Sequence, residues 1–140
     1  MCGRFSLAVA PEVLRQHFGL PVAAEERAVV SRYNIAPSQP VLAVVAGSLQ
    51  RQAVHFRWGL IPRWSQAPQA GWINARAETV AEKPSFRQAF CRRRLLIPAD
   101  GFYEWVGRGK QGRQPYWFYL VERLLTLPPR GFLRSPQKNP

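Results

Sequence analysis

The sequence is poor in the residues from which metal sites are built. Its 140 residues include two cysteines and two histidines, and these lie at the scattered positions Cys2, Cys91, His17 and His55. Zinc sites need such ligands at short, characteristic spacings. We therefore expect no metal site, and we expect the protein to act without a cofactor.

A long apolar segment is also missing. No stretch approaches the roughly 18 apolar residues that a membrane-spanning helix requires. The N-terminus lacks the basic and then apolar pattern of a secretory signal. We therefore expect a cytoplasmic protein with no membrane partner, associated with the nucleoid if the cell is bacterial. In that reducing compartment Cys2 and Cys91 are expected to be free thiols.

Acidic residues are scarce in relation to basic ones. Eight Asp and Glu stand against 20 Lys and Arg, which gives a formal net charge of +12. Such an imbalance on a folded domain favours a polyanionic partner, most simply nucleic acid. The alternative is an arginine-rich codon usage together with a basic tail, which would give the same charge without a nucleic-acid partner. No feature indicates a particular protein partner.

The residues that are abundant predict one folded domain. Hydrophobic residues make up 46% of the chain, with five Trp, eight Phe and four Tyr, enough for a core. Thirteen prolines and ten glycines indicate many turns, as in a β-rich or mixed fold. Local patterns predict helices at residues 11–18 and 84–93 and the start of another at 75–81. They predict an extended loop at residues 31–40 and strands at 3–9, 41–45, 51–58, 95–97, 101–106 and 115–121. In the strand at 51–58, alternation directs Val54, Phe56 and Trp58 to the core and Arg51, His55 and Arg57 outward.

Cys2 directly follows the initiator Met1. Aminopeptidases remove Met when the next residue is small, and removal would leave Cys2 with a free α-amine beside its thiol. This pair can trap an aldehyde, because the amine forms an imine and the thiol then closes a five-membered thiazolidine ring. The alternative is that Cys2 is a small apolar residue at a frayed terminus.

Five strings along the chain carry a resemblance to a known family. They are MCGRF at residues 1–5, RYNIAPSQ at 32–39, WGLIPRW at 58–64, NARAET at 74–79 and PADGFYEW at 98–105. Together, and in this order, they closely resemble the SOS-response-associated peptidase (SRAP) family, whose members are also called abasic-site processing proteins. The resemblance runs from Met1 to about Leu120. It implies an α+β class, a β-rich, barrel-like SRAP fold with flanking short helices.

The resemblance also implies a function. Family members sense abasic sites in single-stranded DNA, and their processed N-terminal Cys forms a thiazolidine with the ring-opened sugar. The resulting covalent DNA–protein crosslink protects the lesion during the SOS response to DNA damage. Peptidase activity is linked to removal of the residues ahead of the Cys, and lyase-type chemistry is linked to the abasic sugar.

Particular residues match the family's site. Cys2, Asn74 and Glu104 would be catalytic, with Glu104 relaying protons and Asn74 holding the sugar or the amine by hydrogen bonds. DNA would contact Arg4 and Arg76 through phosphates and Trp64 and Trp105 through stacking, with Asn34 and Pro37 shaping the pocket wall. The alternatives are an exposed strand glutamate, a turn-capping asparagine, surface arginines, and tryptophans packed in the core.

The end of the chain departs from the family pattern. The family continues with further strands and a histidine before an Arg-Met-Pro sequence, and His17 and His55 do not match that position. We therefore expect a partial SRAP domain at residues 1–120, incomplete at its C-terminus, and a divergent, basic, Pro-rich and weakly structured tail at 121–140. Slower or reversible crosslinking, exposed apolar surface at residues 116–121, marginal stability and self-association would follow.

Two other functions stay open at the level of sequence. The first is an N-terminal-nucleophile cysteine peptidase, in which the free amine activates its own thiol. The second is a non-catalytic remnant that only binds single-stranded DNA. The electrophile that reacts with Cys2 would distinguish these cases.

Overall fold

A computed structural model gives the fold of most of the chain. It describes residues 3–21, 31–62, 64–66, 71–107, 109 and 112–119, together with the backbone of 125–127 and 133–134. Met1 and Cys2 lie outside the described residues. The predicted nucleophile is therefore located only through the strand that follows it.

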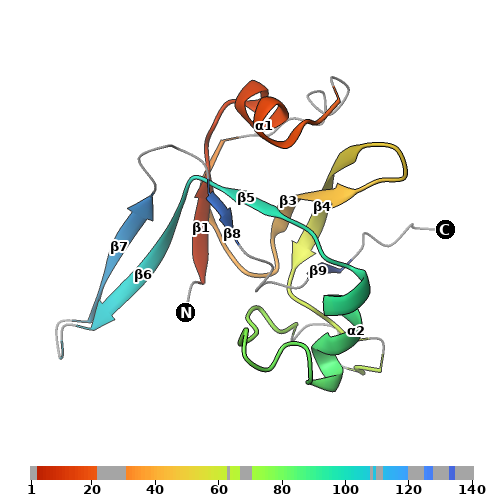
Figure 1. Cartoon of the computed structure of the whole chain (residues 1–140). Helices are drawn as coiled ribbons and strands as arrows, with labels where there is room; N and C mark the ends of the chain where they lie inside the picture. The colour runs from red at the N-terminus through yellow and green to blue at the C-terminus, as the bar shows by residue number, and fades with distance from the viewer. Residues whose placement is uncertain are drawn as a thin grey trace.

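Strands dominate the described part of the chain (Figure 1). In chain order the elements are β1 (Arg4–Leu7), α1 (Pro11–Phe18), β2 (Arg32–Ile35), β3 (Pro40–Ala46), β4 (Arg51–Trp58), α2 (Pro84–Arg92), β5 (Ile97–Ala99), β6 (Gly101–Gly107), β7 (Arg113–Tyr119), β8 (Leu125–Leu127) and β9 (Leu133–Arg134). The strands form three sheets, in the orders β2-β1-β6-β7, β3-β4-β9 and β5-β8, and their recorded pairings are antiparallel. The predicted α+β, β-rich class with short flanking helices is confirmed, and the sheets do not close into one barrel.

Both helices form where local signals predict them. Pro11 occupies the first turn of α1, a position that needs no amide donor, and Gly19 ends the helix with a positive φ of 61°. Leu14 and Phe18, four residues apart on one face, are buried. The second helix likewise begins at a proline and buries Phe86 and Ala89.

The β3–β4 hairpin confirms the predicted alternation in part, because Val54 and Phe56, which were expected in the core, are only half-buried. Trp58 is buried, whereas Arg51, His55 and Arg57 are exposed on the outward face of β4. On β3, Val41 to Val44 are buried, because this strand lies over the main core. Its backbone also exchanges two hydrogen bonds, of 2.8 and 2.9 Å, between Val44 and Leu96, which ties the hairpin to the segment that enters β5.

Two clusters of buried side chains form the core. In the main one, Phe5 from β1 meets Trp58 from β4 edge to face, with ring centroids 5.3 Å apart. The rest of this cluster comprises Leu7, Leu14, Phe18, Leu20, Ile35, Val41, Leu42, Val44, Ile97 and Ala99. A smaller cluster lies beneath α2 and contains Leu60, Val80, Phe86 and Ala89.

Asp100 fastens β1 to the start of β6. Its carboxylate accepts hydrogen bonds from the Ser6 hydroxyl and the Ala8 amide, and its own amide donates to the Ser6 carbonyl at 3.0 Å. The indole Nε1 of Trp117 donates to the Ser6 hydroxyl at 3.0 Å. These bonds fix the register that places Arg4 opposite Tyr103.

Two local predictions were wrong. Residues 31–40, predicted as a loop, contain β2, because Ile35 pairs with Phe5 of β1. Residues 75–81, predicted to begin a helix, form turns instead. Within residues 121–140 the described segments are two short strands, of which β8 pairs with β5 and β9 with β4, and the expected weak structure of the tail stays a prediction. The domain boundary at residue 120 stays a prediction.

An aromatic row is exposed on β7. Tyr116, Trp117, Phe118 and Tyr119 are 44%, 47%, 48% and 59% exposed, which confirms the expected apolar surface for these four residues. Leu120 and Val121 lie outside the described residues. Neither described helix has the length and apolar character that a bilayer crossing demands.

Candidate functional site

The sheet formed by β2, β1 and β6 positions several of the predicted site residues. Arg4 on β1 donates from Nη1 to Oδ1 of Asn34 on β2 at 2.9 Å. On β6 the Tyr103 hydroxyl donates to the Tyr33 carbonyl on β2 at 2.9 Å. Arg4, the first residue of β1, lies opposite Tyr103 of β6. Glu104 is the next residue of β6, so the start of β1, which follows Cys2 in the sequence, lies close to Glu104.

Glu104 is half-buried on β6, opposite Tyr116 of β7. Successive strand residues face opposite sides of a sheet, so Glu104 shares a face with Phe102, whose ring stacks on Phe118 at 5.4 Å. Trp105 points to the other face with Tyr103, at a ring distance of 6.3 Å. Glu104 and Trp105, which are adjacent in the PADGFYEW string, therefore lie on opposite faces of the sheet.

Asn74 lies in a loop whose neighbouring residues are hydrogen-bonded to Trp58 and Leu60 and pack against the main core cluster. The Trp58 indole donates to the Ile73 carbonyl at 3.1 Å, and Leu60 exchanges two backbone hydrogen bonds with Trp72, at 2.9 and 3.0 Å. Ile73 and Phe102 both pack against the main core cluster. Residues adjacent to Asn74 and near Glu104 thus border the same core, although the two come from distant parts of the chain.

The tryptophans predicted to contact DNA lie at the surface. Trp64 is 66% exposed and Trp105 is 39% exposed, which argues against the alternative that they pack in the core. Trp64 lies 6.1 Å from the ring of Trp72, which in turn meets Phe86 edge to face at 5.6 Å. Pro37 is half-buried in the turn after β2, where the amide of Ser38 donates to the Trp58 carbonyl at 2.9 Å.

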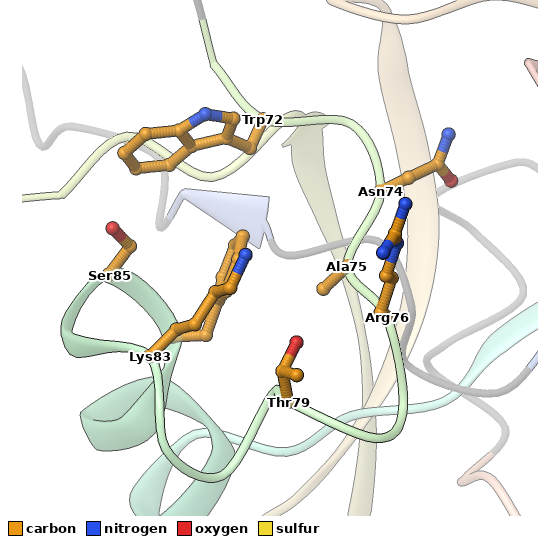
Figure 2. A pocket seen from close by; sticks show the side chains of 8 residues that line it. Trp72, Asn74, Ala75, Arg76, Thr79, Lys83 and Ser85 are labelled. Carbon is orange, nitrogen blue, oxygen red and sulfur yellow. The ribbon is translucent and has the colours of Figure 1, made fainter.

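A pocket of about 490 Å³ lies between the Asn74 loop and α2. It is lined by Trp72, Asn74, Ala75, Arg76, Thr79, Lys83, Ser85 and Phe86. Figure 2 shows the Lys83 ammonium and the Thr79 and Ser85 side chains around the space beneath Trp72, with Arg76 on the opposite side. Of the predicted site residues, the pocket brings together Asn74 and Arg76, whereas Arg4, Asn34, Pro37, Trp64, Glu104 and Trp105 do not line it.

The outward face of β4 carries further positive charge. Arg51, His55 and Arg57 alternate along it, and Arg32 of β2 lies close enough to influence the imidazole. Partial burial of the ring lowers the pKa of His55 below its ordinary value of 6.5, and the positive charge of Arg32 lowers this pKa further. His55 is therefore a neutral residue among arginines at neutral pH.

The described residues contain no group of three or more His, Cys, Asp or Glu side chains arranged to hold a metal ion. Cys91, the cysteine that these residues include, is a free thiol exposed on α2. Side chains of this part of the chain therefore offer no metal centre.

Six of the residues that line the pocket were not predicted from the sequence as site residues: Trp72, Ala75, Thr79, Lys83, Ser85 and Phe86. Trp72 follows Gly71 in a stretch without a helix or strand pattern, and Lys83 directly precedes the predicted helix at residues 84–93. Their shared feature is spatial, since the bridge between Leu60 and Trp72 folds the loop over the start of α2. The sequence places Lys83 four residues after Thr79, the last residue of the NARAET motif. This closeness to the motif was the one local sign that Lys83 could belong to the site.

Comparison with known proteins agrees with the resemblance in the sequence. The family model described as SOS response associated peptidase (SRAP) matches residues 1–128. The Bacillus subtilis abasic site processing protein YoqW is 42% identical over 107 residues, which cover 75% of this chain and 48% of the relative. The mouse abasic site processing protein HMCES is 34% identical over 146 residues, covering 87% and 41%. The Escherichia coli protein YedK, of the same description, is 31% identical over 128 residues, covering 87% and 55%.

Solved structures show the same fold. A protein from Bacteroides thetaiotaomicron superposes with a TM-score of 0.72 at 25% identity, over 89% of this chain and 57% of that one. A phage-related protein from Bordetella bronchiseptica gives a TM-score of 0.71 at 30% identity, over 89% and 58%. The chain spans about half the length of the curated relatives it matches.

Proposed function

Because this chain belongs to the SOS response associated peptidase family, we propose that it processes abasic sites in single-stranded DNA by forming a covalent crosslink through Cys2. The observation that carries the proposal is the placement of Cys2 directly behind Met1, in a chain whose curated relatives are named abasic site processing proteins. The crosslink would protect the lesion from strand cleavage. In a bacterium such a substrate would place the protein at the nucleoid.

The chemistry needs no oxidant and releases one water. After Met1 is removed, the Cys2 amine adds to the aldehyde carbon of the ring-opened sugar and gives a carbinolamine. Loss of water forms an imine, and the thiol adds to its carbon while its proton passes to the nitrogen. Amine and thiol belong to one residue, so ring closure is intramolecular and has a high effective molarity.

Two further residues would assist this sequence. The Glu104 carboxylate would move protons among the amine, the carbinolamine hydroxyl and the thiol. The Asn74 amide would hold the sugar hydroxyl or the amine by hydrogen bonds. The support is that β1, which follows Cys2, pairs with β6 next to Glu104, and that Ile73 and Phe102 border one core.

The DNA strand would lie on the positively charged surface around these residues. Arg4 and Arg76 would contact phosphates flanking the lesion, and the exposed rings of Trp64 and Trp105 would stack on bases. Asn34, hydrogen-bonded to Arg4, would orient that guanidinium, and Pro37 would shape the wall beside it.

The intact mass of the protein after incubation with a uracil-excised single-stranded oligonucleotide tests the proposal. The expected product has lost Met1 and gained the mass of the oligonucleotide less one water. Undamaged oligonucleotide and the variant Cys2→Ala should give no adduct. Adduct formation by Cys2→Ala, or none by the parent protein, would overturn the proposal.

A cysteine peptidase is the second candidate, because the family description itself names a peptidase. Its electrophile would be a peptide amide rather than an aldehyde. Turnover of peptide substrates, lost in Cys2→Ala and unaffected by abasic DNA, would favour this function. A protein that gives no adduct and cleaves no peptide, yet binds oligonucleotides with an affinity that Cys2→Ala leaves unchanged, would only bind DNA.

A further inference from the structure

The pocket beside Asn74 has one aromatic wall that is held in place. The backbone of Trp72 is fixed by its two hydrogen bonds with Leu60, and its ring packs edge to face on Phe86, 5.6 Å away. Nevertheless Trp72 remains 41% exposed. Part of a rigid indole is therefore open to a flat partner, and nucleic-acid bases stack on such surfaces whatever their sequence.

The other side of the pocket carries positive charge and hydroxyl groups. Lys83 has a fixed backbone, since its amide donates to the Thr79 carbonyl at 3.0 Å and its carbonyl accepts from Phe86 and Arg87 at 2.9 Å. Its ammonium is directed into the space beneath Trp72 (Figure 2). Within the described part of the chain, no carboxylate forms an ion pair with Lys83 or Arg76, and none lines the pocket. Two cations with the hydroxyls of Thr79 and Ser85 suit a phosphate group.

The volume of the pocket favours a nucleotide over a bare anion as its ligand. A volume of about 490 Å³ falls in the range of about 300–1,000 Å³ that is usual for small-molecule sites, and it far exceeds what one phosphate fills. Aromatic wall and cationic floor face the same space. A base and its own phosphate would satisfy both at once.

From these observations we propose that Trp72, Thr79, Lys83 and Ser85 form a subsite for one nucleotide of a single DNA strand, with its base on Trp72 and its phosphate at Lys83. The subsite rests on the proposed function in one respect: its lining continues into Asn74 and Arg76, so the nucleotide it holds is one that flanks the abasic sugar. It serves to position the strand and takes no part in bond formation.

Lys83→Ala is the central test, with Arg87→Ala as its matched control. Both remove one exposed cation at the start of α2, but Arg87 does not line the pocket. Affinity for an undamaged oligonucleotide is measured by fluorescence anisotropy at several salt concentrations. Lys83→Ala should weaken binding roughly tenfold and lower the slope of log K against log salt by about 0.7, the value for one phosphate contact on a single strand. Equal effects of the two variants would overturn the subsite.

A second pair of variants introduces a negative charge at the pocket or beside it and leaves the Lys83 ammonium in place. Ser85→Glu places a carboxylate in the pocket, near the start of a helix where acidic side chains are well tolerated. Gln88→Glu places the same charge on the exposed surface of α2, away from the lining. Ser85→Glu should weaken binding at least as much as Lys83→Ala does, and Gln88→Glu should have only a small effect. A small effect of Ser85→Glu contradicts the proposal.

Two further experiments ask whether the pocket binds a free nucleotide rather than a DNA strand, and whether the subsite can be tested independently of crosslinking. A free deoxynucleoside monophosphate that bound as tightly as the oligonucleotide, and as sensitively to Lys83→Ala, would overturn a strand subsite. Because the anisotropy uses undamaged oligonucleotide, it reports binding without covalent chemistry, and adduct formation is measured separately by intact mass. If the parent forms no adduct but Lys83→Ala still differs from Arg87→Ala, the proposed function fails and the subsite stands. If an adduct forms and the two variants match, only the subsite fails.

Discussion

At the scale of single residues, the protein places groups of different chemistry on adjoining positions of one strand. Glu104 and Trp105 point to opposite faces of the sheet, so proton transfer and base stacking would occur on different sides of β6. Arg4 is oriented by Asn34, which restricts a long side chain to one direction. Positional control of this kind is what a site needs when reacting atoms must meet at a fixed distance.

Replacing Glu104 with Gln should slow crosslinking to abasic DNA about a hundredfold or more, because an amide cannot relay protons as a carboxylate does. Binding to undamaged oligonucleotide should change little. The measurement is the rate of adduct formation by gel shift under denaturing conditions. Glu12→Gln, an exposed glutamate on α1, is the control, and a Glu104→Gln rate equal to that of the control would exclude the role.

His55 should make stability depend on pH. Its pKa is lower in the folded protein than the ordinary value of 6.5, so the unfolded chain binds the proton more readily. Stability from this group is complete above about pH 6.5 and is lost as pH falls, until the pH lies below the folded pKa. Urea midpoints measured from about pH 8 to about pH 5 should fall more steeply in the parent than in His55→Gln. Equal slopes in the parent and in His55→Gln would refute the assignment.

At the scale of elements, the β6–β7 hairpin depends on close approach between strands. The Trp117 ring lies against the backbone of Gly101 and reaches across to the Ser6 hydroxyl. A side chain on residue 101 would occupy the same space. Register between β1, β6 and β7, and with it the placement of Glu104, therefore depends on a glycine at the start of β6.

Gly101→Ala should destabilise the protein by about 1–3 kcal/mol, the usual cost of overpacking. A Cβ there would lie 2.2 Å from the Trp117 Nε1 and 2.9 Å from the Phe118 carbonyl oxygen, and the latter is backbone that cannot move aside cheaply. Urea denaturation measures the change. Gly107→Ala, at the other end of β6 with nothing within 4 Å of its added carbon, should alter stability by about 0.5 kcal/mol or less.

At the scale of the whole molecule, charge should govern DNA binding. A chain of net charge +12 releases counterions from the strand when it binds, so affinity falls as salt rises. Between about 50 and 200 mM salt the affinity for an undamaged oligonucleotide should drop roughly tenfold or more. Anisotropy titrations provide the test, and an affinity that does not respond to salt would contradict a phosphate-led interaction.

The exposed aromatic row on β7 should promote association between copies. In the sheet formed by the described strands, β7 lies at the edge, and unpaired edges with apolar side chains invite pairing. Sedimentation velocity should show the average sedimentation coefficient rising with concentration. Tyr119→Lys should reduce this rise, whereas Leu49→Lys, in the turn between β3 and β4 and 98% exposed, should not. A concentration-independent monomer would refute the expectation.

Elements with complete signals inside a short stretch were predictable from the sequence. Helix α1 has its proline, its paired Leu14 and Phe18 and its terminal glycine within nine residues, and β4 shows its alternation in eight. The strand β2 was missed because Asn34 and Pro37 resemble turn residues, and its strand character comes from pairing with Phe5. Pairing between distant segments leaves no local pattern to recognise.

The sequence by itself determined the chemistry on offer: a cysteine behind the initiator methionine, a glutamate in PADGFYEW, an asparagine in NARAET and a large excess of arginine. Only the tertiary structure decided which surfaces these groups share. It set Glu104 and Trp105 on opposite faces, and it brought Trp72 over Lys83 through the Leu60 bridge. The sequence gives the identity of each residue directly. A pocket, in contrast, forms from contacts between distant segments, and these segments meet only when the core is buried.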